Sequence, residues 1–176
     1  MSRLAYGSDA TKTPYEIEDD IRILYAKLSP AEQACEMVHT LIRSGFAKST
    51  ALDDQGWSDL ISWHIKLLNH YYDLLSQLRY LTTTLGSFQY FLLLKRISLL
   101  RPSSISRPSL LSWSLLPDKI WDYGIGPLLE ILPMAGIDHQ HRFLCYTYTL
   151  MTHLYETVFD LNGFWCHYLQ RLTSYR

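Results

Sequence analysis

The chain has 176 residues, of which 48% are hydrophobic and 14% aromatic, and its formal net charge is −1. A chain of this length fits one domain and buries roughly two-thirds of its unfolded surface, so it can form a substantial core. The near-neutral charge excludes general electrostatic attachment to nucleic acid or to an anionic membrane, although a local basic segment could still bind either.

Cysteine usage and the lack of targeting segments indicate an intracellular protein. The chain has three cysteines that are far apart in sequence: Cys35, Cys145 and Cys166. Any disulfide would leave one of them unpaired, which is typical of a reduced compartment. The first 13 residues lack the apolar run of a signal peptide, and no stretch reaches the roughly 18 apolar residues of a membrane span. We therefore expect a soluble protein of the cytoplasm, the nucleus or both, with no membrane contact.

Helices are predicted throughout the first part of the chain. Residues 1–14 are expected to form a flexible tail, followed by a helix over 15–28 with acidic residues near its start. Ser29-Pro30-Ala31-Glu32 has the composition of a new helix start, with a serine cap, a proline at the first position and a capping-box glutamate. A second helix would then extend to Ser44. The alternative is a single helix kinked at Pro30.

Residues 57–79 have the clearest helical pattern. One face repeats at spacings of three and four and is expected to be buried: Trp57, Leu60, Ile61, His64, Leu68, Tyr71 and Leu75. Lys66 falls on the opposite side, among charged and polar residues. We therefore expect Lys66 to face water or a groove.

Residues 81–117 differ in composition and are predicted to be a basic, Ser/Leu-rich insertion in a helical domain that spans 15–176. A helix could form over 88–100, and the Ser- and Pro-rich text after it is typical of a loop. Basic and aromatic residues alternate there, as in nucleic-acid contacts. The candidate residues for such a contact are Lys95, Arg96, Arg101 and Arg107.

The last part of the chain also reads as helical. Residues 118–132 contain two glycines and a proline, which predict a kink or a late start. Asp138 is predicted to cap a long helix over 139–159, whose apolar residues cover more than half of its circumference and indicate a central position. A final helix over 162–175 has a short buried stripe: Trp165, Tyr168, Leu169 and Leu172. Because no alternating strand pattern occurs, we predict an all-α fold.

The spacing of reactive residues argues against catalysis and metal binding. Asp138, His139 and His141 are adjacent, but helix positions i and i+2 point about 200° apart. The sequence has no zinc-ligand pair of the His-Glu-x-x-His or Cys-x-x-Cys type, no nucleophile elbow and no phosphate loop. No paired acid–base constellation can be assembled from it. We predict a protein that is not an enzyme, with no catalytic residue, metal ligand or cofactor.

Three segments together resemble one known family: SDLISWHIKLLNHYYDLL (58–75), KIWDYGIGPLLEILP (119–133) and FLCYTYTLMTHLYETVFDLNGFWCHYLQRLTSYR (143–176). They resemble the N-terminal helical domain of telomerase-activator Est1-type proteins and of the SMG-type adaptors of nonsense-mediated mRNA decay, and more closely fungal proteins that carry this domain. The resemblance implies a 14-3-3-like, tetratricopeptide-like antiparallel helical array. It also implies that the array is incomplete at its C-terminal end, where the family continues into further hairpins.

The resemblance also implies a binding site. Adaptors of this family bind phosphorylated serine or threonine peptides with a lysine and an arginine on a concave face. The lysine, a few residues after an Asp-Leu pair, matches Lys66. The arginine belongs to a closing Arg-Tyr-Arg, which here reads Ser174-Tyr175-Arg176, so a serine takes its place. Losing a charge-assisted hydrogen bond of roughly 1.5–3 kcal/mol weakens binding on the order of ten- to a hundredfold. Arg171 and Arg176 are the candidates to compensate.

The function implied by the resemblance is that of a non-enzymatic adaptor or scaffold for protein–protein interaction, in mRNA surveillance or telomere maintenance, with a weakened phosphopeptide pocket. Its expected partners are proteins, including phosphorylated peptides. Two alternatives stay open at this point. One is a nucleic-acid-binding module that uses the basic middle segment, and the other is a degenerate fragment without a binding role.

Overall fold

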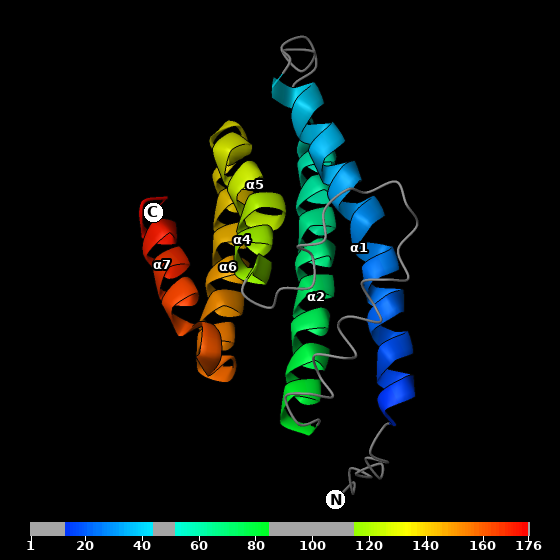
Figure 1. The fold of residues 1–176 in the computed structure, drawn as a ribbon. Helices are drawn as coiled ribbons and strands as arrows, with labels where there is room; N and C mark the ends of the chain where they lie inside the picture. Colours follow the sequence, from blue (N-terminus) through cyan, green and yellow to red (C-terminus); the bar gives the residue numbers. More distant parts are fainter. Residues whose placement is uncertain (1–12, 44–51, 85–114, 176) are drawn as a thin grey trace, which may run out of the picture.

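The structure, a computed structural model, describes residues 13–43, 52–84 and 115–175. Figure 1 shows its elements, which are in chain order α1 (Pro14–Arg43), α2 (Asp54–Thr84), α4 (Leu116–Lys119), the π-helical turn η4 (Ile120–Ile125), α5 (Gly126–Ile131), the 3-10 turn η5 (Leu132–Met134), α6 (Ile137–Thr157), the 3-10 turn η6 (Phe159–Leu161) and α7 (Asn162–Thr173). No strand occurs in the described ranges, and the predicted all-α class is confirmed.

The helices form an array of two layers. α1 packs along α2, and α6 packs along α7. The α4–η4–α5 segment lies between these two pairs and contacts α1, α2 and α7, while α2 contacts α6 directly (Figure 1). One layer therefore contains α1, the α4–η4–α5 segment and α7, and the other contains α2 and α6. The buried residues of both layers form a single hydrophobic cluster.

A capping box fixes the start of α1. The Glu16 amide donates to the Thr13 hydroxyl at 3.4 Å, and the Thr13 amide and hydroxyl donate to the Glu16 carboxylate at 2.7 and 2.9 Å. Pro14 suits the first helical position because the N–H that it lacks would have no partner there. The helix starts one residue earlier than predicted, and residues 1–12 of the predicted tail lie outside the described ranges.

α1 continues through Pro30, so the predicted second start at Ser29 is wrong and the alternative of one helix is correct. Residues 29–32 have the same cap signature as residues 13–16. Leu28 and Cys35 on either side of the proline are each 3% exposed, because both are part of the core. Their burial outweighs the roughly 3 kcal/mol that a proline costs inside a helix.

α2 is longer than predicted, and its predicted buried face is confirmed, with every residue of the stripe at most 7% exposed. α7 likewise buries Trp165, Tyr168 and Leu172, while Leu169 is only partly buried. The predicted helix over 88–100 and the Ser- and Pro-rich loop after it fall on residues outside the described ranges. In the part of the chain that the structure describes, no helix combines the length and hydropathy needed to cross a bilayer.

The irregularity predicted around the two glycines is a π-helical turn. Pro127 has no amide proton, and the Gly126 amide donates to the carbonyl of Trp121, five residues back. The backbone of Gly124 lies against α2, since a Cβ placed there would be 2.5 Å from Cδ2 of Leu68. This close approach fixes η4 on α2.

α6 is capped by Gly136, so the predicted capping role of Asp138 is wrong. The extended backbone of Gly136 (φ −61°, ψ 155°) ends the preceding turn and starts the helix at Ile137. Asp138 lies instead in the first turn, where its carboxylate still offsets the helix dipole. α6 contacts α2, η5, η6 and α7, which confirms its predicted central position.

Candidate functional site

α2 and α6 lie side by side and run in the same direction. Three side-chain hydrogen bonds join them, in the same order along both helices: Asp54 to His139 at 2.7 Å, Asn69 to Tyr146 at 2.7 Å and Tyr72 to His153 at 2.9 Å. Because the residue numbers of the bonded partners increase together along both helices, the two helices are parallel. The three polar contacts hold the two helices side by side along their length.

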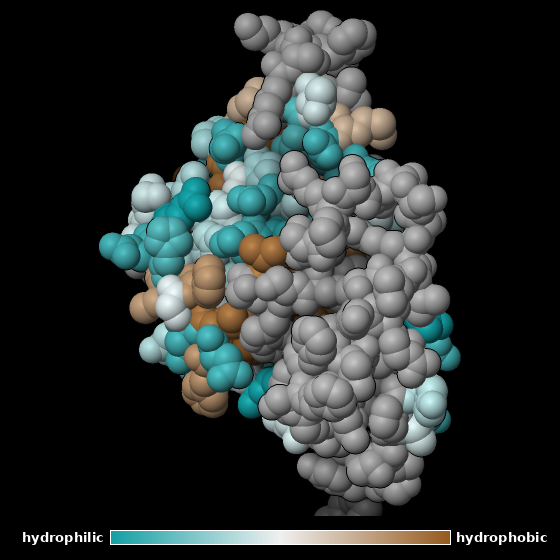
Figure 2. Space-filling model, viewed as in Figure 1, coloured by the Kyte–Doolittle hydropathy of each residue, from teal (hydrophilic) through white to brown (hydrophobic). Residues whose placement is uncertain are grey.

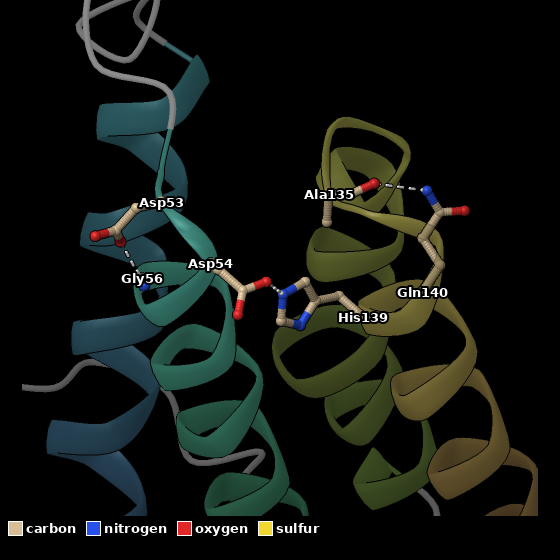
Figure 3. A network of polar contacts seen from close by, with 6 residues as sticks. All are labelled: Asp53, Asp54, Gly56, Ala135, His139 and Gln140. Atoms are coloured by element: carbon tan, nitrogen blue, oxygen red, sulfur yellow. Dashed lines mark hydrogen bonds and ion pairs between the residues drawn. The ribbon is translucent and has the colours of Figure 1, made fainter.

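Figure 3 shows the first of these contacts, where both helices begin. Asp53 accepts a hydrogen bond from the Gly56 amide at 2.8 Å and so caps α2. The Gln140 side chain donates to the Ala135 carbonyl at 2.9 Å and holds the turn before α6. The bond between Asp54 and His139 thus joins two helix starts that are each fixed locally, and this sets the register of α6 on α2.

Lys66 is exposed in the middle of α2, as the helical pattern predicted. His64, two residues earlier, is 0% exposed, and its Nδ1 is 2.8 Å from the Gly124 carbonyl of η4. Because positions i and i+2 of a helix point about 200° apart, Lys66 points away from η4. Asn69, which contacts α6 through Tyr146, is one turn from Lys66 on the same face. Lys66 therefore lies on the exposed side of α2, one turn before the Asn69–Tyr146 contact.

Arg171 lies on the other layer. Its guanidinium is 4.2 Å from the ring centroid of Trp121 in η4 and 5.9 Å from that of Tyr168. Burial raises the pKa of the neighbouring Asp122 carboxyl, and the charge of Arg171 opposes this shift. Arg171 stacks on the segment that Lys66 points away from, so the structure does not bring the two candidate residues together.

Ser174 closes α7 and supplies no charge. Its amide and hydroxyl both donate to the Arg171 carbonyl, at 3.2 and 2.7 Å. Arg176 lies outside the described residues. So do the four nucleic-acid candidates, and that interpretation stays a prediction: Lys95, Arg96, Arg101 and Arg107.

An open groove of about 550 Å³ lies between α4 and α7. Its lining residues are Asp118, Asp160, Gly163, Phe164, His167 and Tyr168. In Figure 2 the side of the molecule formed by α7 carries both hydrophilic and hydrophobic residues. Because the groove carries two carboxylates, it does not suit a phosphorylated ligand.

Sequence reasoning missed a pair of buried histidines. His39 of α1 and His64 of α2 are 3% and 0% exposed, and their Nε2 atoms are 2.9 Å apart. The Gly124 carbonyl can only accept a hydrogen bond, so Nδ1 of His64 carries the proton and its Nε2 accepts from His39. Burial lowers the pKa of His64 to about 4. The pair joins α1, α2 and η4. It lies on the buried side of α2, whereas Lys66 lies on the exposed side.

Over residues 13–43, 52–84 and 115–175, no group of three His, Cys, Asp or Glu side chains is placed to hold a metal ion. His139 bonds to Asp54, whereas His141 is exposed on α6.

No family model matches the chain, and no curated protein or solved structure does so either. The class that the fold and the site define is an all-α helical array of two layers, with polar contacts between two parallel helices.

Proposed function

We propose that the protein is a non-enzymatic helical adaptor that binds a phosphorylated segment of a partner protein on the exposed face of α2 and α6. The observation that carries the proposal is the position of Lys66. Its side chain is exposed on α2 and forms no ion pair with any residue in the described ranges. Beside it, Asn69 and Tyr146 provide neutral hydrogen-bonding groups.

The chemistry of this face suits a phosphate group. A phosphorylated serine or threonine has a charge of about −1.5 to −2 and three strong acceptor oxygens, which a lysine ammonium can bind as a point charge. The resemblance to Est1-type and SMG-type adaptors supports the same reading, because it assigns phosphate binding to Lys66. The resemblance also suggests that the helical array binds phosphorylated partners as 14-3-3-like adaptors do, in mRNA surveillance or telomere maintenance.

Replacing Lys66 with glutamate is expected to weaken phosphopeptide binding at least about tenfold, because the change removes a charge-assisted bond and adds repulsion. The measurement is calorimetric titration with a degenerate phosphoserine peptide library and its unphosphorylated counterpart. Lys27→Glu is the matched control, since Lys27 is exposed on α1, and it should bind as the original chain does.

Circular dichroism should show the same helix content for both variants. The proposal predicts saturable binding of the phosphorylated library alone. It is wrong if the original chain binds neither library, or if a folded Lys66→Glu variant binds the phosphorylated library as tightly as the original chain.

A further inference from the structure

The open groove between α4 and α7 has aromatic walls. Phe164 and Tyr168 are four residues apart on α7, and both line the groove. Phe164 is 37% exposed, whereas Tyr168 is 5% exposed and stacks on Trp121 of η4, with ring centroids 4.9 Å apart. Gly163 lines the same groove and leaves it open, because a Cβ at that position would meet no atom within 4 Å. The groove therefore offers flat apolar surface to a ligand.

Two carboxylates line the same groove, Asp118 of α4 and Asp160 of η6. The Tyr168 hydroxyl donates to Oδ1 of Asp118 and so holds that carboxylate against α7. Neither aspartate forms an ion pair with any residue that the structure describes. Among the described residues that line the groove, none is a lysine or an arginine. The groove therefore attracts a cation.

Arg171, beside the groove, shows how this surface holds a guanidinium. Its side chain lies over the Trp121 ring, 4.2 Å from the centroid, and 5.9 Å from the centroid of Tyr168. Burial and the charge of Asp118 raise the pKa of the Asp122 carboxyl, and the charge of Arg171 lowers it. Arg171 thus offsets the negative charge of Asp122 and leaves the carboxylates of the groove for a cation from outside.

We propose that the groove between α4 and α7 binds an arginine side chain of a partner protein. A guanidinium is planar and always charged, so it stacks on aromatic rings and donates paired hydrogen bonds to carboxylates. Phe164 and Tyr168 provide the rings, and Asp118 and Asp160 provide the carboxylates. The inference goes beyond the proposed function, because it concerns a ligand of opposite charge on a different part of the molecule from Lys66. Its failure leaves phosphopeptide binding as it is.

The test measures peptide binding by fluorescence anisotropy. One unphosphorylated peptide with a central arginine is selected on the original chain from a degenerate library. Its two counterparts have lysine or citrulline in place of that arginine, and citrulline has nearly the same shape without the charge. The variants are Asp118→Asn, Asp160→Asn and Gly163→Leu. Asp138→Asn is the matched control, because Asp138 is exposed at the start of α6, whereas α7 follows the end of that helix. Circular dichroism confirms folding for each variant.

The arginine peptide should bind the original chain about tenfold more tightly than the citrulline peptide, with the lysine peptide in between. Asp118→Asn and Asp160→Asn should each weaken binding of the arginine peptide about three- to tenfold, and Asp138→Asn should not. Gly163→Leu should also weaken it, although both carboxylates remain, because the leucine side chain fills the open groove.

Three results would overturn the inference. The first is equal binding of the arginine and citrulline peptides, or of the arginine and lysine peptides, by the original chain. The second is a loss in Asp138→Asn as large as that in Asp160→Asn, which would mean general attraction to negative charge. The third is a folded Gly163→Leu variant that binds the arginine peptide as tightly as the original chain.

Discussion

Replacing Gly124 with alanine is expected to lower the free energy of unfolding by roughly 1–3 kcal/mol, the usual range for overpacking a core. The added Cβ would lie 2.5 Å from Cδ2 and 3.2 Å from Cγ of Leu68. Leu68 is 0% exposed, so its side chain cannot turn into solvent to make room. Either η4 or Leu68 must shift. Urea unfolding, monitored by helix content, measures the change.

Two further variants test whether the clash is the cause. Gly163→Ala is the matched control, because a Cβ at that position in α7 has no atom within 4 Å. It should be stabilising by about 0.5–1 kcal/mol, since alanine favours a helix. Leu68→Ala combined with Gly124→Ala should be less destabilising than the sum of the single changes, because it removes the atoms that clash. Strict additivity of the two changes would argue against this contact as the cause.

Acidification from pH 6.5 to 4 is expected to remove roughly 3 kcal/mol of stability through His64 alone. An unfolded histidine binds a proton below a pKa of about 6.5, whereas burial holds the pKa of folded His64 at about 4. In this window the unfolded state binds more protons than the folded state, so stability falls by about 1.4 kcal/mol per pH unit. Above pH 6.5 the residue is neutral in both states, and this contribution disappears.

The measurement is the free energy of unfolding as a function of pH for the original chain and for His64→Gln. The glutamine variant should be less stable at pH 8, because it loses the two hydrogen bonds that the His64 ring makes with His39 and with the Gly124 carbonyl. Its pH slope between 6.5 and 4 should be shallower by about one proton. His141→Gln, a change at an exposed position of α6, should leave the slope as it is. An unchanged slope in His64→Gln would show that His64 does not titrate as its burial requires.

Helices whose apolar residues repeat at spacings of three and four could be predicted from the sequence. The stripe of α2 from Trp57 to Leu75 gave both the buried face and the outward direction of Lys66, since a helix with one buried face must expose the other. The stripe of α7 was predicted for the same reason. In both helices the pattern is local and repeats over several turns.

Features that depend on tertiary packing could not be predicted. Residues 13–16 and 29–32 have the same cap signature, and only the burial of Leu28 and Cys35 decides that the second lies inside a helix. The His39–His64 pair joins residues on two helices and has no local signal. The contact between α2 and α6 is a similar case, because Asn69 and Tyr146 are 77 positions apart.

Photo-cross-linking shows whether a phosphorylated segment binds along α2 and α6. A phosphoserine peptide with a benzoylphenylalanine next to the phosphoserine is irradiated with the protein, and the attachment sites are located by mass spectrometry after proteolysis. The expected result is attachment to α2 and α6, around Lys66 and Tyr146, and none with the unphosphorylated peptide. Attachment to η4 and α7, around Trp121 and Arg171, would contradict it.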